Sequence, residues 1–312
     1  MERFLVTGGA GFIGSNICSR LVAEGCFVRV LDNLSTGKKA NLSRILDRIE
    51  FVQADMGDPD VARTAMQGID VVLHQGALPS VPRSVEDPGS THRHCVDATF
   101  TLLMAARDAK VRRFVYAASS SAYGDSPTLP KVETMAARPL SPYAVGKLVG
   151  EYYCSVFSKL YGLETVSLRY FNVFGPQQDP TSQYAAAIPA FVTCILKGLP
   201  PTVYGDGEQS RDFTYVDNVV HANLLAARAT RTGGEVVNIA CGEAITVNAI
   251  LAAINRIVGR DIRPVHVPAR AGDVKHSLAD IAVARSLLAY SPVVGFSDGL
   301  EAAIDWYRKN LI

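Results

Sequence analysis

The sequence predicts an α/β protein that consists of a doubly wound parallel sheet and a smaller α/β lobe. Short apolar segments alternate with helical patterns through the first half of the chain, which is typical of a parallel sheet covered by helices on both faces. Beyond about residue 172, loops that carry Gly, Pro and Gln separate shorter elements. We therefore expect residues 1–171, with a segment returning at about 212–232, to form the sheet domain, and residues 172–312 to form mainly the second, interleaved lobe.

The first predicted strand leads directly into a glycine-rich turn. Residues 4–7 form a short apolar run, glycines follow at positions 8, 11 and 14, and a helical apolar pattern comes next. In a Rossmann-type fold, Gly8 allows the tight turn, Gly11 the close approach of a pyrophosphate, and Gly14 the close packing of helix on strand. Because the free N–H groups of the helix start point at the phosphates, this stretch predicts a dinucleotide site.

The second predicted strand, residues 27–31, ends at Asp32. A carboxylate at that place accepts hydrogen bonds from both hydroxyls of an adenosine ribose and repels a 2′-phosphate, so we expect NAD rather than NADP. Lys38 and Lys39 would favour NADP, but they follow the loop 33–37 and we expect them to be solvated.

Further strands complete the predicted sheet. They are expected at residues 50–53, 71–74, 113–118 and 164–169, with helices between them such as 58–66 and 96–109. Ligands of doubly wound sheets bind at the carboxyl ends of the strands. Polar or small residues follow three of these strands, at 55–56, 75–77 and 119–121, so we expect them to share one rim of the sheet.

A helix that begins near Ser141 and Pro142 places Tyr143 and Lys147 on one face, because they are four residues apart. A phenol normally loses its proton near pH 10, and shifting this to neutrality takes roughly 4 kcal/mol. The lysine charge and a positively charged ring cofactor would both act in that direction. Taken alone, the spacing of Tyr143 and Lys147 is also compatible with an ordinary amphipathic helix that carries a surface lysine.

The second lobe contains two segments suited to a charged substrate, residues 211–213 and 270–273. Arginine binds a phosphate in a bidentate manner, and aspartate accepts ribose hydroxyls. Each segment taken singly could equally be a structural ion pair. A C-terminal helix is expected at about 300–309.

The composition excludes several classes of protein. The chain has 312 residues, 48% hydrophobic residues and a formal net charge of +1, so no basic footprint for nucleic acid is visible. Without an apolar run of membrane-spanning length or room for a signal peptide, we expect no membrane contact and a cytoplasmic location. The six cysteines lack metal-binding spacing, His92 and His94 are expected to be structural or surface residues, and no metal site is predicted.

Four motifs together resemble the extended short-chain dehydrogenase/reductase superfamily, and specifically its nucleotide-sugar 4-epimerases. They are residues 7–14, Tyr143-x-x-x-Lys147, residues 169–176 and residues 211–217, and the resemblance covers essentially the whole chain. It implies an isomerase with NAD as cofactor, a UDP-sugar as substrate, and a homodimer joined through helices of the first lobe.

The resemblance also implies a role for individual residues. The catalytic residues would be Ser119, Tyr143 and Lys147. Those that bind NAD would be Gly8, Gly11, Phe12, Ile13, Gly14, Asp32, Asn33, Ser35, Thr36, Gly37, Asp55, Met56, Gln75, Ala77, Tyr143, Lys147 and Tyr170. Those that bind the UDP-sugar would be Ser80, Ser120, Ser121, Tyr143, Asn172, Tyr204, Arg211, Arg270, Asp273 and Ser277.

In such enzymes the tyrosine takes the proton of the sugar 4-hydroxyl while the serine hydrogen-bonds the same oxygen. Hydride passes from C4 to the nicotinamide and returns to the other face of a transient 4-keto sugar. The resemblance thus implies that Tyr143 and Ser119 act on one oxygen, without net redox change.

The choice of sugar follows from segments 272–277 and 77–83, which resemble epimerases of 2-acetamido sugars. Ser277 would leave room for an N-acetyl group, where a tyrosine would narrow the pocket. We therefore expect UDP-N-acetylglucosamine and UDP-N-acetylgalactosamine as substrates, with UDP-glucose and UDP-galactose as further ones.

Several alternatives stay open at this point. A 4-epimerase restricted to UDP-glucose or one acting on UDP-glucuronate is compatible with the sequence. A UDP-glucuronate decarboxylase would carry a glutamate near Ser121, which is absent, and a non-catalytic dinucleotide-binding protein would have no need of the catalytic set. Cys95 stands where relatives usually have an asparagine that helps to hold the nicotinamide region.

Overall fold

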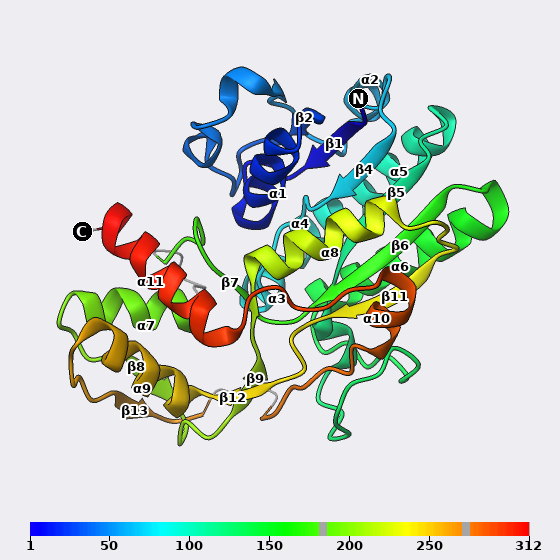
Figure 1. Ribbon diagram of the computed structural model, residues 1–312. Coiled ribbons are helices and arrows are strands. Elements are labelled where there is room, and N and C mark those ends of the chain that lie inside the picture. The colour runs from blue at the N-terminus through cyan, green and yellow to red at the C-terminus, as the bar shows by residue number, and fades with distance from the viewer. Residues whose placement is uncertain (181–185, 270–274, 312) are drawn as a thin grey trace.

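The chain folds around a seven-stranded parallel sheet, seen in a computed structural model that describes residues 1–180, 186–269 and 275–311 (Figure 1). The strand order is β11-β6-β5-β4-β1-β2-β3, and each neighbouring pair is parallel. The strands are β1 (Arg3–Thr7), β2 (Phe27–Leu31), β3 (Glu50–Val52), β4 (Val71–His74), β5 (Arg113–Ser119), β6 (Glu164–Tyr170) and β11 (Glu235–Ile239). The direction of winding reverses between β1 and β4, which is where such sheets bind ligands.

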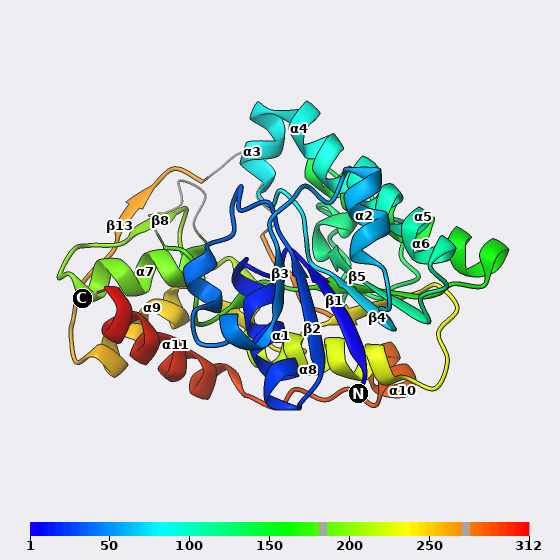
Figure 2. The same cartoon turned by 90° about the horizontal axis from the view of Figure 1, so that it is seen from above.

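Helices cover both faces of this sheet (Figure 2). On one face lie α1 (Phe12–Ala23) and α8 (Val216–Arg228); on the other lie α2 (Pro59–Ala65), α5 (Ala98–Asp108) and α6 (Pro142–Tyr161). Alternate residues of a strand enter the two cores: Phe4 and Val6 pack with the α1 side, and Leu5 packs with the α2 and α5 side. The strands are therefore apolar on both faces, as expected for a fully covered parallel sheet.

The predicted strands are confirmed to within a residue or two at their ends, and the doubly wound fold class is confirmed. The sequence analysis missed β11, which pairs with β6 although about seventy residues separate them in the chain. The helix expected over residues 96–109 begins instead as a π-helical turn, Arg93–Asp97, before α5. Wide turns of this kind are frequent at functional sites.

The remaining elements form the smaller lobe and the links to it. They are α3 (Val81–Glu86), α4 (Pro88–His92), β7 (Val173–Phe174), α7 (Ala187–Leu196), β8 (Thr202–Tyr204), β9 (Ser210–Asp212), β10 (Thr214–Tyr215), β12 (Ala244–Thr246), α9 (Val247–Val258), β13 (Val265–Val267), α10 (Ala282–Leu288) and α11 (Phe296–Leu311). Three two-stranded pairs, β10-β7, β12-β9 and β13-β8, build this part together with α7, α9 and α11. The C-terminal helix is longer than the 300–309 that the sequence predicted.

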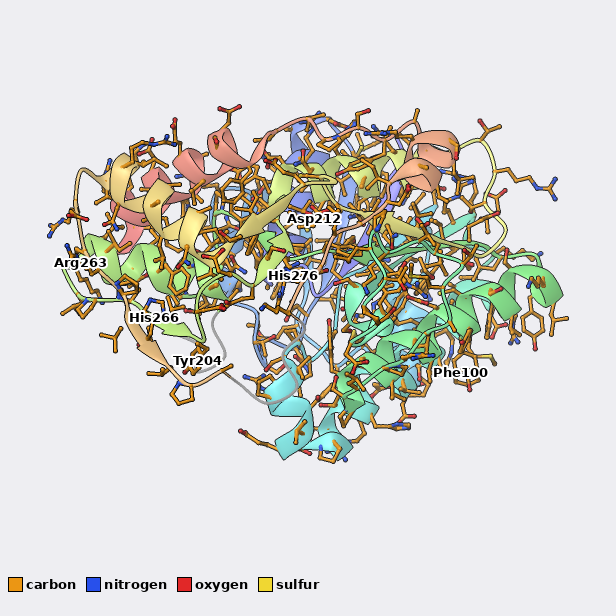
Figure 3. The ribbon with its side chains drawn as sticks, turned by 90° about the horizontal axis from the view of Figure 1, so that it is seen from below. Phe100, Tyr204, Asp212, Arg263, His266 and His276 are labelled. Carbon is orange, nitrogen blue, oxygen red and sulfur yellow. The ribbon has the colours of Figure 1, made fainter. Side chains whose placement is uncertain are left out.

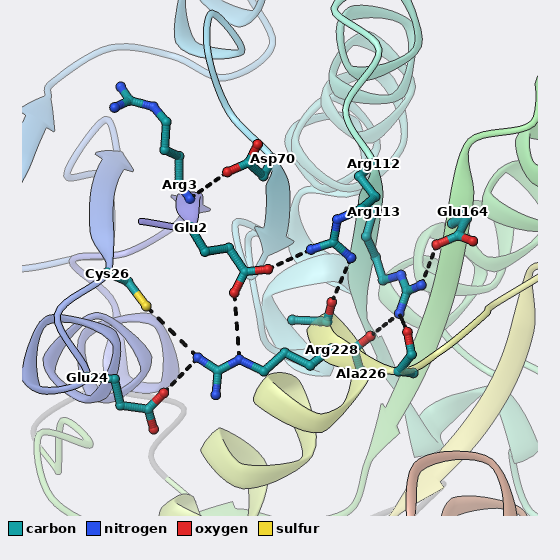
Figure 4. A network of polar contacts seen from close by, with 12 residues as sticks. Glu2, Arg3, Glu24, Cys26, Asp70, Arg112, Arg113, Glu164, Ala226 and Arg228 are labelled. Carbon is teal, nitrogen blue, oxygen red and sulfur yellow. Dashed lines mark hydrogen bonds and ion pairs between the residues drawn. The ribbon is translucent and has the colours of Figure 1, made fainter.

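An arginine network ties α8 to the sheet (Figure 4). Arg113 of β5, which is 1% exposed, donates to the carbonyls of Ala226 at 2.9 Å and Ala229 at 2.6 Å and is ion-paired with Glu164. Arg228 pairs with Glu24 at 2.7 Å. Because these contacts close the end of the sheet opposite the strand carboxyl ends, they stabilise the fold and leave the other rim free for ligands.

No helix in the described ranges is long and apolar enough to cross a membrane.

Candidate active site

A cavity of about 660 Å³ opens at the carboxyl ends of the central strands. Most of the residues expected to bind NAD line it: Gly8, Gly11, Phe12, Ile13, Gly14, Asp32, Asn33, Ser35, Thr36, Met56, Gln75, Ala77, Tyr143, Lys147 and Tyr170. Gly37 and Asp55 do not line it. Gly37 packs against the Asp32 carboxylate, and the exposed Asp55 accepts a hydrogen bond from the Asn33 amide at 3.3 Å, so each of them contacts a residue that lines the cavity.

The glycine turn is packed too closely to accept side chains. Gly8 has a φ of +65°, and a Cβ there would come within 2.6 Å of Gly76 Cα. A Cβ at Gly14 would come within 2.2 Å of the Gly8 carbonyl oxygen. Helix α1 therefore starts against the turn, and no side chain caps its first N–H groups. This cradle fits the pyrophosphate of a dinucleotide.

The Asp32 carboxylate stands at the end of β2 and is 8% exposed. It accepts hydrogen bonds from the backbone N–H groups of Ala10 at 2.9 Å and Leu34 at 2.8 Å, which fixes its orientation. A carboxylate has about four acceptor positions, so two remain for ribose hydroxyls.

Ser119 and Tyr143 meet at the rim between β5 and α6. The Ser119 oxygen accepts hydrogen bonds from the Ser121 amide at 3.2 Å and from the Ser121 hydroxyl at 2.8 Å. Because the oxygen already accepts two hydrogen bonds, its own proton is free to donate to the Tyr143 oxygen, with which it is hydrogen-bonded. A sugar oxygen placed beside Tyr143 would therefore lie within reach of two hydroxyl groups.

The pKa of Tyr143 lies well above its ordinary value, contrary to the lowering predicted from the lysine. Burial of the phenol is the main cause, Cys95 raises the pKa further, and the Ser119 hydrogen bond lowers it. Lys147 is not among the groups that shift this pKa, and its ammonium group donates to the Ala117 carbonyl at 2.8 Å. Burial thus favours the protonated phenol.

Tyr170 is held by a hydrogen-bonded triad behind the cavity wall. Asn223 of α8 donates to the Tyr170 oxygen at 2.8 Å, and the tyrosine hydroxyl donates to Gln75 at 3.1 Å. The Gln75 amide in turn donates to Asn223 at 3.0 Å. Sequence reasoning missed Asn223, because nothing in its local pattern distinguishes it from an ordinary helix residue.

Residues 177–179, from the second half of the chain, lie next to the glycine turn and the start of α1. Gln177 and Asp179 line the cavity, with Gln177 hydrogen-bonded to Ser15 and to the Asn41 carbonyl. Lys38 also lines it and forms an ion pair with Asp179 at 2.6 Å. Its side chain is 57% exposed, as expected of a solvated lysine, and the ion pair with Asp179 is a contact that the sequence did not predict.

His94 lines the cavity as well, which corrects its assignment as a structural or surface residue. It belongs to the π-helical turn, whose wider helical path brings it to the wall. Its neighbour Cys95 is buried and faces α6, where a Cβ at Gly146 would come within 3.1 Å of the Cys95 Cβ. The sequence signal for His94 was its position next to Arg93, with His92 on the other side.

The residues expected to bind the UDP-sugar are more dispersed. Ser80 lines the cavity; Ser120, Ser121, Asn172, Tyr204, Arg211 and Ser277 do not, and Arg270 and Asp273 lie outside the described residues. Figure 3 shows Asp212 and His276 between the two parts of the molecule and Tyr204 at the β8–β13 pair. Cofactor and substrate residues thus occupy adjoining regions.

Asp212 organises the region where the substrate residues gather. Its buried carboxylate accepts hydrogen bonds from the backbone N–H groups of Cys241 at 2.9 Å, Gly242 at 2.9 Å and Ala279 at 3.3 Å. Its own carbonyl accepts a hydrogen bond from the Asn172 amide at 3.1 Å. Asn172 and the segment that follows Ser277 are therefore both hydrogen-bonded to Asp212.

Among the described residues, no group of three or more His, Cys, Asp or Glu side chains could hold a metal ion.

Comparison with known proteins adds the family to this geometry. Residues 4–240 match the NAD dependent epimerase/dehydratase family. The chain is 37% identical over 311 residues to the UDP-glucose 4-epimerase of Mycolicibacterium smegmatis. The aligned region covers 98% of this chain and 99% of that protein.

Two solved structures show the same fold over the whole chain. The UDP-N-acetylglucosamine 4-epimerase from Methanobrevibacter ruminantium in complex with UDP-N-acetylmuramic acid is 38% identical, with a TM-score of 0.95 over 99% of this chain and 98% of that one. The UDP-glucuronic acid 4-epimerase from Bacillus cereus, in complex with UDP-glucuronic acid and NAD, is 34% identical, with a TM-score of 0.90 over 98% of this chain and 99% of that one.

Proposed function

The chain belongs to the NAD dependent epimerase/dehydratase family, and we propose that it interconverts UDP-N-acetylglucosamine and UDP-N-acetylgalactosamine, with UDP-glucose and UDP-galactose as further substrates. It is an isomerase, and NAD is its cofactor. The observation that carries the proposal is the position of Tyr143: it lines a cavity whose other wall is the dinucleotide cradle, and it is hydrogen-bonded to Ser119, which stands beside the cavity and is not one of its lining residues.

The cavity residues suit the roles that this reaction needs. When bound, NAD accepts hydride from the sugar and returns it, and its oxidised ring adds a positive charge near Tyr143. That charge acts against the burial that raises the pKa of the phenol. Ser119 donates a hydrogen bond to the Tyr143 oxygen and so favours the phenolate in the same sense. Tyr143 then takes the proton of the sugar hydroxyl and gives it back after the hydride returns.

The nucleotide end of the substrate is assigned to the region around Asp212. Asn172 donates to the Asp212 carbonyl at 3.1 Å, and Arg211 donates to the Lys275 carbonyl at 3.0 Å. The Ser277 amide donates to the Ser210 carbonyl at 3.0 Å, so the residue assigned to the N-acetyl group of the hexose lies beside this region. Arg270 and Asp273, which stand outside the described residues, stay predictions for the same site.

A second candidate is a 4-epimerase of UDP-glucuronate. The observation that favours it is Arg83, which lines the cavity from α3 and could meet a sugar carboxylate. A 4-epimerase restricted to UDP-glucose is the third, and it predicts that acetylated sugars are rejected. The decarboxylase and the non-catalytic alternatives are supported by no residue at the site.

A homodimer is also part of the proposal. Val145, Tyr152, Val156 and Leu160 form one stripe of α6, and each is at least 43% exposed. At 3.6 residues per turn, this stripe lies about half a turn away from Tyr143. An exposed apolar stripe on a helix is typical of an interface between subunits, so the partner would pack behind the catalytic face. Both the homodimer and the cytoplasmic location stay predictions.

The decisive experiment is an epimerase assay without added cofactor. Purified protein is incubated separately with UDP-N-acetylglucosamine, UDP-glucose and UDP-glucuronate, and the 4-epimer of each is detected by chromatography. We expect turnover of the acetylated pair, because a reaction without net redox change can use NAD that stays bound.

The matched variants are Tyr143→Phe and Tyr161→Phe, which remove a hydroxyl from the same helix at the cavity and at an exposed site. Tyr143→Phe should lower kcat by at least about 10²-fold and leave NAD binding intact, whereas Tyr161→Phe should behave as the wild type. A fully active Tyr143→Phe enzyme refutes the assignment.

The substrate assignment is tested by Ser277→Tyr, with Ser286→Tyr on an exposed helical position as control. If Ser277 makes room for the N-acetyl group, the variant should lose activity on acetylated sugars by about tenfold or more and keep most of its activity on UDP-glucose. Equal loss on both sugars contradicts the role of Ser277.

A further inference from the structure

We propose that the buried ion pair between Glu151 and Arg169 is a positioning device for the reaction. It fixes the face of α6 that carries Tyr143 and Lys147, and it supplies the carboxylate that Lys147 faces inside the protein. The inference rests on the proposed function, since it concerns how the same catalytic side chains are held.

The Glu151–Arg169 ion pair is bidentate and shielded from solvent. Arg169 donates from Nε to one carboxylate oxygen of Glu151 at 2.8 Å and from Nη2 to the other at 2.8 Å. The side chains are 5% and 2% exposed, so neither water nor salt screens the contact. A bidentate contact fixes the orientation of both groups as well as their distance. The pair therefore sets how α6 sits against β6.

Glu151 continues the catalytic face of α6. Tyr143, Lys147 and Glu151 are spaced four residues apart and lie on one side of the helix, within about a quarter of a turn. Arg169 stands near the carboxyl end of β6, and the next residue, Tyr170, lines the cavity. A rotation of α6 that broke the ion pair would thus turn Tyr143 and Lys147 away from the rim.

The helix is also pressed onto β5, which leaves it little freedom apart from rotation. A Cβ at Gly150 would come within 2.3 Å of the Tyr116 oxygen, and the Tyr116 hydroxyl donates to the Lys147 carbonyl at 3.3 Å. Close packing sets the distance between helix and sheet, and the ion pair fixes the helix around its own axis. The two contacts together determine where the catalytic face points.

Glu151 is one of the three groups, with Cys95 and Cys154, that raise the pKa of Lys147 and so favour its charged form. The lysine is 3% exposed, and this burial lowers its pKa, whereas Cys95 and Glu151 raise it. The titratable groups that face it come from four elements: Cys95 of the π-helical turn, His74 of β4, Tyr116 of β5, and Tyr143, Glu151 and Cys154 of α6. Glu151 is the carboxylate among them, so its removal should make the lysine easier to deprotonate.

Stability alone does not explain the pair. Among the described residues, Arg169 Nη1 is buried without a hydrogen-bond partner, and the guanidinium lies over the Tyr123 ring at 4.6 Å instead. A buried ion pair with an unsatisfied N–H is commonly no more stable than apolar residues of the same size. Tyr123 ends the turn that carries Ser119, so the arrangement connects both catalytic elements.

The test compares two ways of removing the pair. Glu151→Gln leaves the arginine without its counter-charge and could fail to fold; the double variant Glu151→Met with Arg169→Met removes both charges and keeps an apolar contact. The matched control is Glu164→Gln, which breaks the Arg113–Glu164 ion pair at the amino end of the same strand.

Two readouts are used on the protein with NAD bound. One is the kcat and KM for the UDP-hexose. The other is the ¹⁵N NMR titration of the Lys147 Nζ resonance, assigned by its absence in Lys147→Arg, which needs no turnover.

We expect the double variant to fold, to bind NAD and to keep KM within about twofold, while kcat falls about 10- to 100-fold because the reacting groups are misplaced. Its Lys147 should lose the proton at a lower pH than in the wild type, and Glu164→Gln should change neither readout. An unchanged kcat together with an unchanged lysine titration in the double variant overturns the inference. If the wild type turns over no UDP-hexose, the proposed function fails, and the lysine titration alone decides for or against the ion pair.

Discussion

Asp212→Asn should change how the stability of this protein depends on pH. The Asp212 carboxyl is 0% exposed, and its burial raises the pKa from 3.8 to about 6, although three backbone N–H groups act in the opposite direction. Because the folded protein holds this proton more tightly than the unfolded chain, the contribution to stability is largest below pH 4 and is lost as the pH rises to about 6.

The size of the effect follows from the shift. A rise from 3.8 to about 6 corresponds to about 3 kcal/mol of differential free energy. Because part of the change lies below pH 4, the free energy of unfolding of the wild type, relative to Asp212→Asn, should fall by about 2 kcal/mol between pH 4 and pH 7. The lost hydrogen bonds of the asparagine variant add an offset that does not vary with pH.

The assay is urea unfolding at several pH values and constant ionic strength, with equal NAD content in both proteins. Asp206→Asn serves as the control, because the exposed Asp206 carboxylate accepts the Glu208 N–H at 2.9 Å and its pKa is lowered. Its difference from the wild type should change in the opposite direction, with wild-type stability gained as the pH rises. A wild-type minus Asp212→Asn difference that is flat or rises with pH would refute the burial argument.

Two further predictions concern the cofactor cradle. Gly14→Ala puts a Cβ within 2.2 Å of the Gly8 oxygen, so α1 must shift by about 1 Å and NAD affinity, measured by calorimetry, should fall at least about tenfold. Gly295→Ala, whose Cβ would meet only the Asp298 carboxylate at 3.9 Å, should leave affinity unchanged. Lys38→Gln breaks the exposed ion pair with Asp179 and should speed NAD release about two- to fivefold in stopped-flow experiments at low salt. Unaltered affinity in Gly14→Ala, or equal release rates for Lys38→Gln and wild type, would contradict these readings of the cradle.

The elements built from local signals were predictable. The run from β1 through the glycine turn to α1 is contiguous in the chain, and so is the start of α6, where the Ser141 hydroxyl accepts a hydrogen bond from the Ala144 N–H at 3.2 Å. Asp32 was placed by its position at the end of a strand. In each case turn chemistry, capping and periodicity act over a few residues, so the sequence contains the whole signal.

Contacts between distant segments were not predictable in this way. Asn223 reaches Tyr170 and Gln75, and Asp179 reaches Lys38, across 53 to 148 residues of chain. The strand β11 pairs with β6, although the elements from β7 to α8 lie between them in the chain. Such pairings depend on where the fold brings the chain back, which has no periodic signature.

Local patterns in the chain were enough to predict a parallel sheet with a dinucleotide turn, and a tyrosine and a lysine one helical turn apart. The acidity of that tyrosine became clear from the packed structure, because burial and not the neighbouring Lys147 dominates its pKa. The packed structure also places Glu151 and Arg169 in a buried ion pair between α6 and β6. Spacing along a chain fixes which side chains share a helix face, whereas desolvation and long-range pairing depend on everything that packs around them.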